Sequence, residues 1–169
     1  MEQADSHEEQ RVGAVADHAG KYLTFVLQNE VYGIGIRKVK EIIGLMPITT
    51  VPQTPAFVEG VINLRGKVIP VVDLRSRFGM AKAAHTDRTC IIVVEIALAL
   101  RPIPVGIVVD EVSEVLNIKE GDIDETPSFG VRLEMDFIMS MAKVDDGVKI
   151  LLDIDRVITG SGSWQLNAA

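Results

Sequence analysis

The chain has 169 residues, of which 47% are hydrophobic and 24% charged, and a formal net charge of −7. This length and hydrophobic content suit one domain, or two small domains that share a core. The acidic balance argues against a nucleic-acid-binding protein, which needs a basic face against phosphates, and the sequence has no basic cluster.

The same composition predicts a soluble, cytoplasmic protein. Cys90 is the only cysteine, so no intrachain disulfide is expected. The N-terminus lacks the basic-then-apolar order of a signal peptide. The longest apolar run, from Cys90 to Leu100, contains Glu95 and is too short for the roughly 20 residues that span a bilayer. We therefore expect no direct membrane insertion.

Residues 1–20 are acidic, lack sustained periodicity and are predicted to form a flexible N-terminal tail. From Lys21 to Leu27, apolar side chains alternate as in a strand of a small barrel. Gln28-Asn29-Glu30 then turns the chain. Val31–Ile36 returns as a second strand, whose glycines allow a bend or a close backbone approach.

The most informative segment is 51–79. Its two apolar runs, Val61–Leu64 and Val68–Val72, flank Arg65-Gly66-Lys67, which predicts a tight hairpin turn with an arginine at its tip. Asp73 follows as a predicted helix N-cap. The segment contains no nucleophile with a base beside it. It is typical of a surface that holds other proteins.

The second half of the chain repeats the first. The pattern from Gly33 to Ile42 recurs 73 positions later, from Gly106 to Val115. The pattern from Val68 to Leu74 recurs 80 positions later, from Val148 to Ile154, so that Asp145-Asp146-Gly147 takes the hairpin position. Each half thus offers about five short strands and only one-turn helices.

Small sheets hide their edges by closing into barrels, and neither half buries enough surface alone. We therefore expect an all-β fold of two SH3-like five-stranded β-barrel subdomains around a shared core, with short helical turns. The two intertwined halves occupy residues 21–160, with a boundary near 80–90. A groove between the subdomains is the natural place for a partner, and residues 161–169 form a C-terminal tail.

Candidate catalytic residues are few. His7 and His18 fall in the predicted tail and His85 in a polar loop, and no cluster has metal-ligand spacing, so we expect no metal and no cofactor. The repeat-related Asp73 and Asp153 raise the alternative of a bilobal carboxylate hydrolase, because paired carboxylates can share a proton. Each aspartate also ends a strand and opens a helical turn, which capping explains.

Several positions keep two interpretations. Arg65 is either a turn arginine in a surface ion pair or a donor to a partner carboxylate or to another loop. The apolar residues Val39, Val112 and Val115 suit the core, but as a set they suit a partly exposed stripe. Trp164 either packs on the barrel or stays mobile.

Together these features resemble the CheW family of bacterial chemotaxis coupling proteins. The pattern V-I-N-L-R-G-x-V-I-P-V-V-D-L, together with the ordered repeats, is the strongest part of the resemblance. The matching segments are Phe25–Ile42, Val51–Gly79, Val105–Leu116 and Val144–Ile158.

The resemblance implies a non-enzymatic adaptor. CheW-like proteins bind the regulatory domain of the histidine kinase CheA and the cytoplasmic tips of methyl-accepting chemoreceptors, and CheW-like modules alternate in rings at the inner face of the membrane. It also implies roles for individual positions. Receptor coupling falls to Arg65, Val39, Glu41, Val112 and Val115, and the kinase-contact segment contains Gly60, Asn63 and Leu64.

Two departures from the family pattern stand out: Ser140 replaces a usual glycine, and the acidic tail is not shared. A chain that ends at Ala169 leaves no room for a receiver domain, so we expect a stand-alone adaptor. The alternative is a CheW-like scaffold of a motility or developmental pathway, which the sequence does not distinguish from chemotaxis.

Overall fold

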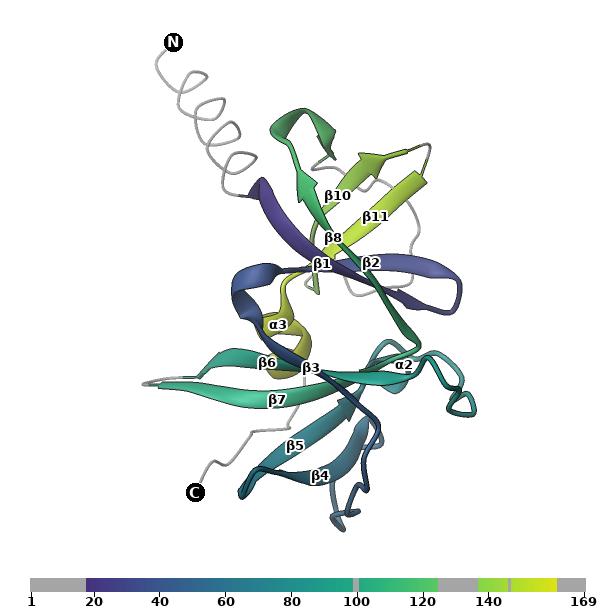
Figure 1. Cartoon of the computed structure of the whole chain (residues 1–169), viewed down its shortest axis with the longest axis vertical. Helices are drawn as coiled ribbons and strands as arrows, with labels where there is room; N and C mark the ends of the chain where they lie inside the picture. The colour runs from purple at the N-terminus through teal and green to yellow at the C-terminus, as the bar shows by residue number, and fades with distance from the viewer. Residues whose placement is uncertain (1–17, 99–100, 125–136, 146, 161–169) are drawn as a thin grey trace.

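The computed structural model describes residues 18–98, 101–124, 137–145 and 147–160. The described residues form two antiparallel-rich sheets and only short helices (Figure 1). Sheet 1 contains β1 (Gly20–Leu27), β2 (Glu30–Gly35), β8 (Glu111–Ile118), β9 (Ile123–Asp124), β10 (Ile138–Val144) and β11 (Gly147–Leu152). Sheet 2 contains β3 (Val39–Gly44), β4 (Val58–Leu64), β5 (Lys67–Asp73), β6 (Cys90–Leu98) and β7 (Arg101–Val109). The helices are η1 (Ile36–Lys38), α2 (Leu74–Arg77), η2 (Glu120–Asp122) and α3 (Ile154–Thr159).

The strand order is β8-β1-β2-β11-β10-β9 in sheet 1 and β3-β6-β7-β5-β4 in sheet 2. The predicted all-β fold with two subdomains and helical turns is confirmed. Sheet 1 has six strands rather than five, because the two-residue strand β9 pairs with β10. The predicted hairpin turn is also shorter than expected, since Lys67 already belongs to β5.

The two sheets are not the two sequence halves. The first half contributes β1 and β2 to sheet 1 and β3, β4 and β5 to sheet 2, and the second half does the converse. The boundary expected near 80–90 does not separate the sheets, because β6 and β7 follow it and belong with β3–β5. Parallel pairing joins the halves at equivalent places: Val71 lies opposite Gly106, and Leu151 opposite Gly33.

Three apolar clusters hold the molecule together. One lies inside sheet 2 and includes Ile62 and Val93, and another lies inside sheet 1 around Tyr22 and Leu151. The largest lies between the sheets and takes residues from both, such as Phe25 and Ile107. The expected shared core is therefore confirmed. The neighbouring strands β6 and β7 bury side chains on both of their faces, as Ile91 and Ile92 of β6 show.

The helices begin where the sequence predicts. The Asp73 carboxylate accepts a hydrogen bond from the backbone N–H of Arg75, and Asp153 accepts one from Arg156, each at 3.3 Å. Helix α3 packs between the sheets (Figure 1), with Ile154 and Val157 buried in the shared core. Both predicted N-caps are thus confirmed.

Some predictions fall outside the described residues: the N-terminal tail up to residue 17 with His7, the turn residue Asp146, and the C-terminal tail with Trp164. Among the helices that the structure describes, none has the length and apolar character required to cross a bilayer.

Candidate functional site

The hairpin between β4 and β5 displays Arg65 at its tip. Arg65 and Gly66 both have positive φ, 51° and 85°, as a two-residue type I′ turn requires. Glycine adopts this conformation without strain, and the Asn63 side chain accepts a hydrogen bond from the Gly66 N–H at 2.9 Å. The turn therefore holds the arginine at a fixed place on the surface.

Arg65 contacts Glu41 on the edge strand β3. One guanidinium nitrogen, Nη1, donates to both carboxylate oxygens of Glu41, at 3.0 and 2.9 Å. This hydrogen bonding raises the pKa of the Arg65 guanidinium above its usual value. The Arg65 side chain is 72% exposed and that of Glu41 25% exposed, so the pair is open to solvent on the arginine side.

A cavity of about 170 Å³ lies beside this ion pair. Ile69 and Val93, which belong to the interior of sheet 2, give it an apolar wall. Three basic side chains, from Lys40, Arg65 and Lys67, also line it, and Glu41 is its acidic group. The remaining lining residues are Leu64 and Pro104. The cavity combines an apolar wall with a basic rim, which suits an apolar side chain next to a carboxylate.

The structure brings together only part of the predicted coupling set. Arg65 and Glu41 touch, and Val39 lies on the same strand as Glu41, half-buried against the shared core. Val112 and Val115 lie on β8, at the edge of sheet 1. Val112 packs against the shared core, whereas Val115 is 50% exposed.

The predicted kinase-contact segment coincides with β4. Gly60 is buried, Asn63 is exposed and fixes the hairpin turn, and Leu64 is half-buried against the interior of sheet 2. Asn63 and Leu64 thus adjoin the arginine tip, while Gly60 serves the packing of the strand.

Exposed apolar side chains form a second group that sequence reasoning only partly identified. Ile42 and Val68 on sheet 2 are 46% and 70% exposed, and Val115 and Val148 on sheet 1 are 50% and 49% exposed. The offset of 73 relates Ile42 to Val115, and the offset of 80 relates Val68 to Val148. The repeat was the signal that could have identified Ile42, Val68 and Val148.

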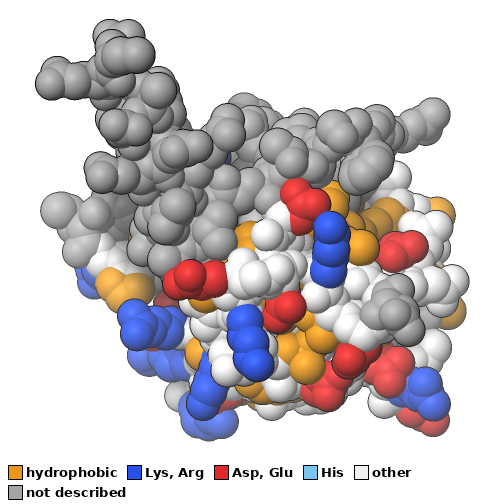
Figure 2. Space-filling model, turned by 90° about the horizontal axis from the view of Figure 1, so that it is seen from above, with side chains coloured by type: hydrophobic (Ala, Val, Ile, Leu, Met, Phe, Trp, Pro, Cys, Tyr) orange, Lys and Arg blue, Asp and Glu red, His pale blue; other side chains and the backbone are white. Residues whose placement is uncertain are grey.

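Both signs of charge occur on the face that Figure 2 shows. Several basic side chains lie toward the lower left, acidic ones lie mostly to their right, and hydrophobic side chains form small groups between them. That distribution on the visible face lacks the continuous basic surface that phosphate binding requires.

The geometry gives no support to the alternative of a catalytic carboxylate pair. Asp73 and Asp153 each cap their own helix, and Asp73 also accepts from the Ser76 hydroxyl at 2.9 Å. His85 is an exposed loop residue, and no group of three or more potential metal ligands occurs in the described part of the chain. Helix capping accounts for both aspartates.

Comparison with known proteins identifies the family of this chain. Residues 21–161 match the family described as the CheW-like domain. The chain belongs to the CheW family. It is 37% identical over 139 residues to the chemotaxis protein CheW of Klebsiella aerogenes, which covers 82% of this chain and 81% of the relative. It is 35% identical to CheW of Rhizobium meliloti over 83% of this chain and 93% of the relative.

A solved CheW structure has the same fold. The scaffolding protein TtCheW from Thermoanaerobacter tengcongensis superimposes with a TM-score of 0.75 at 37% identity, covering 85% of this chain and 96% of that one. The predicted CheW resemblance is therefore confirmed, and the protein is a chemotaxis adaptor of the CheW type.

The family departure at Ser140 is accommodated within β10. Ser140 pairs with Leu151 directly after a bulge that separates it from Ile138; it is 1% exposed, and its hydroxyl has no hydrogen-bond partner among the residues that the structure describes. Ser140 therefore lies inside a strand and not in a turn.

Proposed function

We propose that this CheW-family protein is a non-enzymatic adaptor that couples methyl-accepting chemoreceptors to the regulatory domain of the histidine kinase CheA. It would act in the cytoplasm, at the inner face of the membrane, within receptor arrays. The relatives' chemotaxis names and the scaffold role of TtCheW support this proposal. The observation that carries it on this chain is the Arg65–Glu41 pair beside an open cavity.

The receptor contact is assigned to β3 and the hairpin tip. A receptor tip of the kind that CheW proteins bind is a helical hairpin, whose amphipathic face can place apolar and acidic side chains at helical spacing. The apolar wall formed by Ile69 and Val93 suits the apolar side chains of such a helix, and the basic side chains of Lys40 and Lys67 suit its acidic side chains. Because Arg65 is mostly exposed, its guanidinium can exchange Glu41 for a partner carboxylate without a burial cost.

The kinase contact is assigned to β4 around Gly60, Asn63 and Leu64, next to the exposed Val68. Val68 on sheet 2 and Val148 on sheet 1 are related by the repeat, so each sheet has an exposed apolar side chain at the equivalent position. Two similar spots on one chain suit neighbours on both sides, such as the CheA regulatory domain and other CheW-like modules in a ring. Many modest contacts then act together through effective concentration, so none has to be tight.

The decisive experiment reverses the charge of Arg65. Arg65→Glu places a carboxylate against Glu41 and the receptor's acidic side chains, so receptor control of CheA activity should be lost in reconstituted arrays, with the β-fold kept. The matched control is Arg88→Glu, because the Arg88 side chain is 74% exposed and its one ion pair among the described residues is a 3.5 Å contact with Glu111.

The outcomes separate the assignments. Retained control in the folded Arg65→Glu protein would return Arg65 to a surface ion pair with no coupling role. Failure of the wild-type chain to associate with both the kinase and receptor fragments would reject the adaptor proposal itself. Loss of control in the Arg88 variant as well would show a general charge effect.

A further inference from the structure

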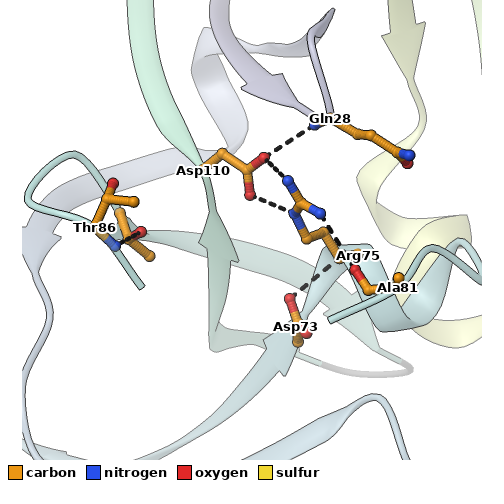
Figure 3. Close-up of polar contacts among 7 residues, drawn as sticks. Gln28, Asp73, Arg75, Ala81, Thr86 and Asp110 are labelled. Atoms are coloured by element: carbon orange, nitrogen blue, oxygen red, sulfur yellow. Dashed lines mark hydrogen bonds and ion pairs between the residues drawn. The ribbon is translucent and has the colours of Figure 1, made fainter. Parts of the chain in front are cut away.

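Two ion pairs outside the proposed binding surfaces join the sheets. In the first, Arg75 of α2 donates to Asp110 in the β7–β8 crossover, Nε to Oδ1 at 2.7 Å and Nη2 to Oδ2 at 2.5 Å (Figure 3). Asp110 also accepts from the backbone N–H of Gln28 at 2.9 Å. Because Arg75 follows β5 of sheet 2 and Gln28 follows β1 of sheet 1, one carboxylate binds both subdomains.

The second ion pair does the same on the other helix. Lys38 in η1 donates to Asp155 of α3 at 2.6 Å. The other carboxylate oxygen of Asp155 accepts from the backbone N–H of Ala97 at 2.8 Å. Helix α3 follows β11 of sheet 1, and Ala97 belongs to β6 of sheet 2. We call these two contacts the α2 clamp (Arg75, Asp110, Gln28 N–H) and the α3 clamp (Asp155, Lys38, Ala97 N–H).

The internal repeat relates the clamps to each other. The offset of 80 places Asp155 at the position of Arg75. Leu23 pairs with Ile34, and Ile92 pairs with Ile107, the residue that the offset of 73 relates to Ile34. Leu23 and Ile92 are therefore equivalent, which gives β1 and β6 an offset of 69. The same offset takes Gln28 to Ala97. The offset of 73 takes Arg37, next to Lys38, to Asp110.

The polarity of the two clamps is opposite. The helix carries the cation in the α2 clamp and the anion in the α3 clamp, and the crossover carries the reverse. In both, the carboxylate binds the equivalent backbone amide, Gln28 or Ala97. The contact is thus present at both equivalent places although its residues differ, which is expected if the contact itself is useful.

Each clamp fixes the start of a strand that carries proposed binding residues. Lys38 directly precedes Val39, and Asp110 directly precedes Glu111, the first residue of β8. We propose that Arg75, Asp110, Lys38 and Asp155 are positioning residues, which set the orientation of β3 relative to β8 by locking one sheet on the other. This orientation would present β3 and β8 together to one partner, and that part of the inference rests on the proposed function.

The test measures orientation directly and without a partner. Spin labels at Val68→Cys and Val148→Cys, equivalent exposed sites on the two sheets, report the inter-sheet distance in a Cys90→Ala background. Asp110→Asn and Asp155→Asn keep an oxygen for the backbone amide but remove the charge. We expect a broader distance distribution, or a second maximum, when both are combined, and a smaller broadening for each alone.

Ion pairs within a single sheet provide the controls. Lys40→Ala removes the pair with Glu95 within sheet 2, and Lys143→Ala removes the pair with Asp124 within sheet 1, so both should keep the wild-type distribution. A folded double variant, verified by its thermal transition, with an unchanged distribution would overturn the proposal. If the double variant does not fold, the same criterion applies to each single variant.

Binding is then measured separately with receptor and kinase fragments. Broadening together with a threefold to tenfold loss of affinity, about the range of mutations that act through conformation, supports the positioning role for the proposed function. A broader distance distribution with unchanged affinity would reject that role, while the clamps would still fix one sheet on the other. No binding by the wild-type chain would reject the proposed function and leave the distance result valid.

Discussion

Gly60 and Ser140 occupy the same position in the two repeats, but only Gly60 has a positive φ. Each lies at a bulge, in the pairing of β4 with β5 and of β10 with β11. Gly60 has φ of 145°, and a Cβ on it would lie 2.0 Å from the carbonyl oxygen of Thr49. The backbone of Thr49 approaches β4 through two hydrogen bonds with Val61, each of 2.9 Å. This close approach makes glycine necessary at position 60, whereas position 140 admits a side chain.

Gly60→Ala is expected to destabilise the protein by about 2–5 kcal/mol, from backbone strain together with the clash against Thr49. The measurement is urea unfolding followed by circular dichroism. Gly44→Ala, also in a strand of sheet 2, is the matched control, because a Cβ there meets no atom within 4 Å; its effect should be within about 0.5 kcal/mol. Equal effects of the two substitutions would contradict the assignment.

Ser140→Ala is expected to leave the free energy of unfolding unchanged or to raise it by about 1 kcal/mol. The substitution removes a buried hydroxyl that has no partner among the described residues, so its desolvation cost disappears and none of the described hydrogen bonds is lost. Chemical unfolding of the two proteins in parallel gives the difference. A clear loss of stability would mean that the hydroxyl has a partner in solution.

The α2 clamp predicts a specific dependence of stability on pH. The hydrogen bonds from Arg75 hold the pKa of Asp110 below its usual value. A carboxyl with a lowered pKa in the folded state adds stability above its unfolded pKa, near 3.9, and loses it as the pH falls through the folded value. Asp110→Asn should therefore cost about 1 kcal/mol at neutral pH and less at pH 2.

Unfolding in urea across pH 2–7 measures this effect. Arg75→Met should give a similarly shallow pH profile, because it removes the cation that lowers the Asp110 pKa. A wild-type slope in both folded variants would show that the pair does not contribute to acid sensitivity.

Burial raises the pKa of the Cys90 thiol, and the negative charge of Glu111 raises it further, although a hydrogen bond from the Val112 backbone acts in the opposite direction. Since the thiolate is the reactive form, alkylation by iodoacetamide at pH 8 should be slower in the folded protein than in urea. Mass spectrometry of timed samples measures both rates. Equal rates would show that Cys90 is more accessible than the structure indicates.

Much of the fold could be predicted because strand periodicity and turn residues are local signals. The alternation after Lys21, the Arg65-Gly66 turn and the N-caps Asp73 and Asp153 all appear as expected. The exchange of strands between the halves could not be predicted. Period-two alternation marks a strand but not its partner, and the parallel pairs β2–β11 and β5–β7 join residues far apart in the chain.

The candidate site was predictable residue by residue but not as an arrangement. The hairpin displays Arg65, and Glu41 was already a candidate, but their contact joins two residues that lie 24 positions apart in the chain. Asp110 and Asp155 gave no distinct signal, because a charged residue in a crossover or a short helix is usually solvated. Only the folded chain reveals that Asp110 binds the backbone amide of Gln28 and that Asp155 binds that of Ala97.

The opposite polarity of the two clamps also protects the folding of a duplicated chain. Equivalent segments of a repeat compete for each other's places, and the buried residues Leu74 of α2 and Ile154 of α3 are one such equivalent pair. Such an exchange would place Arg75 against Lys38 and Asp155 against Asp110. Like charges at close range repel, so each helix is accepted only at its own crossover. The reversed charges therefore oppose an exchange of α2 and α3 during folding.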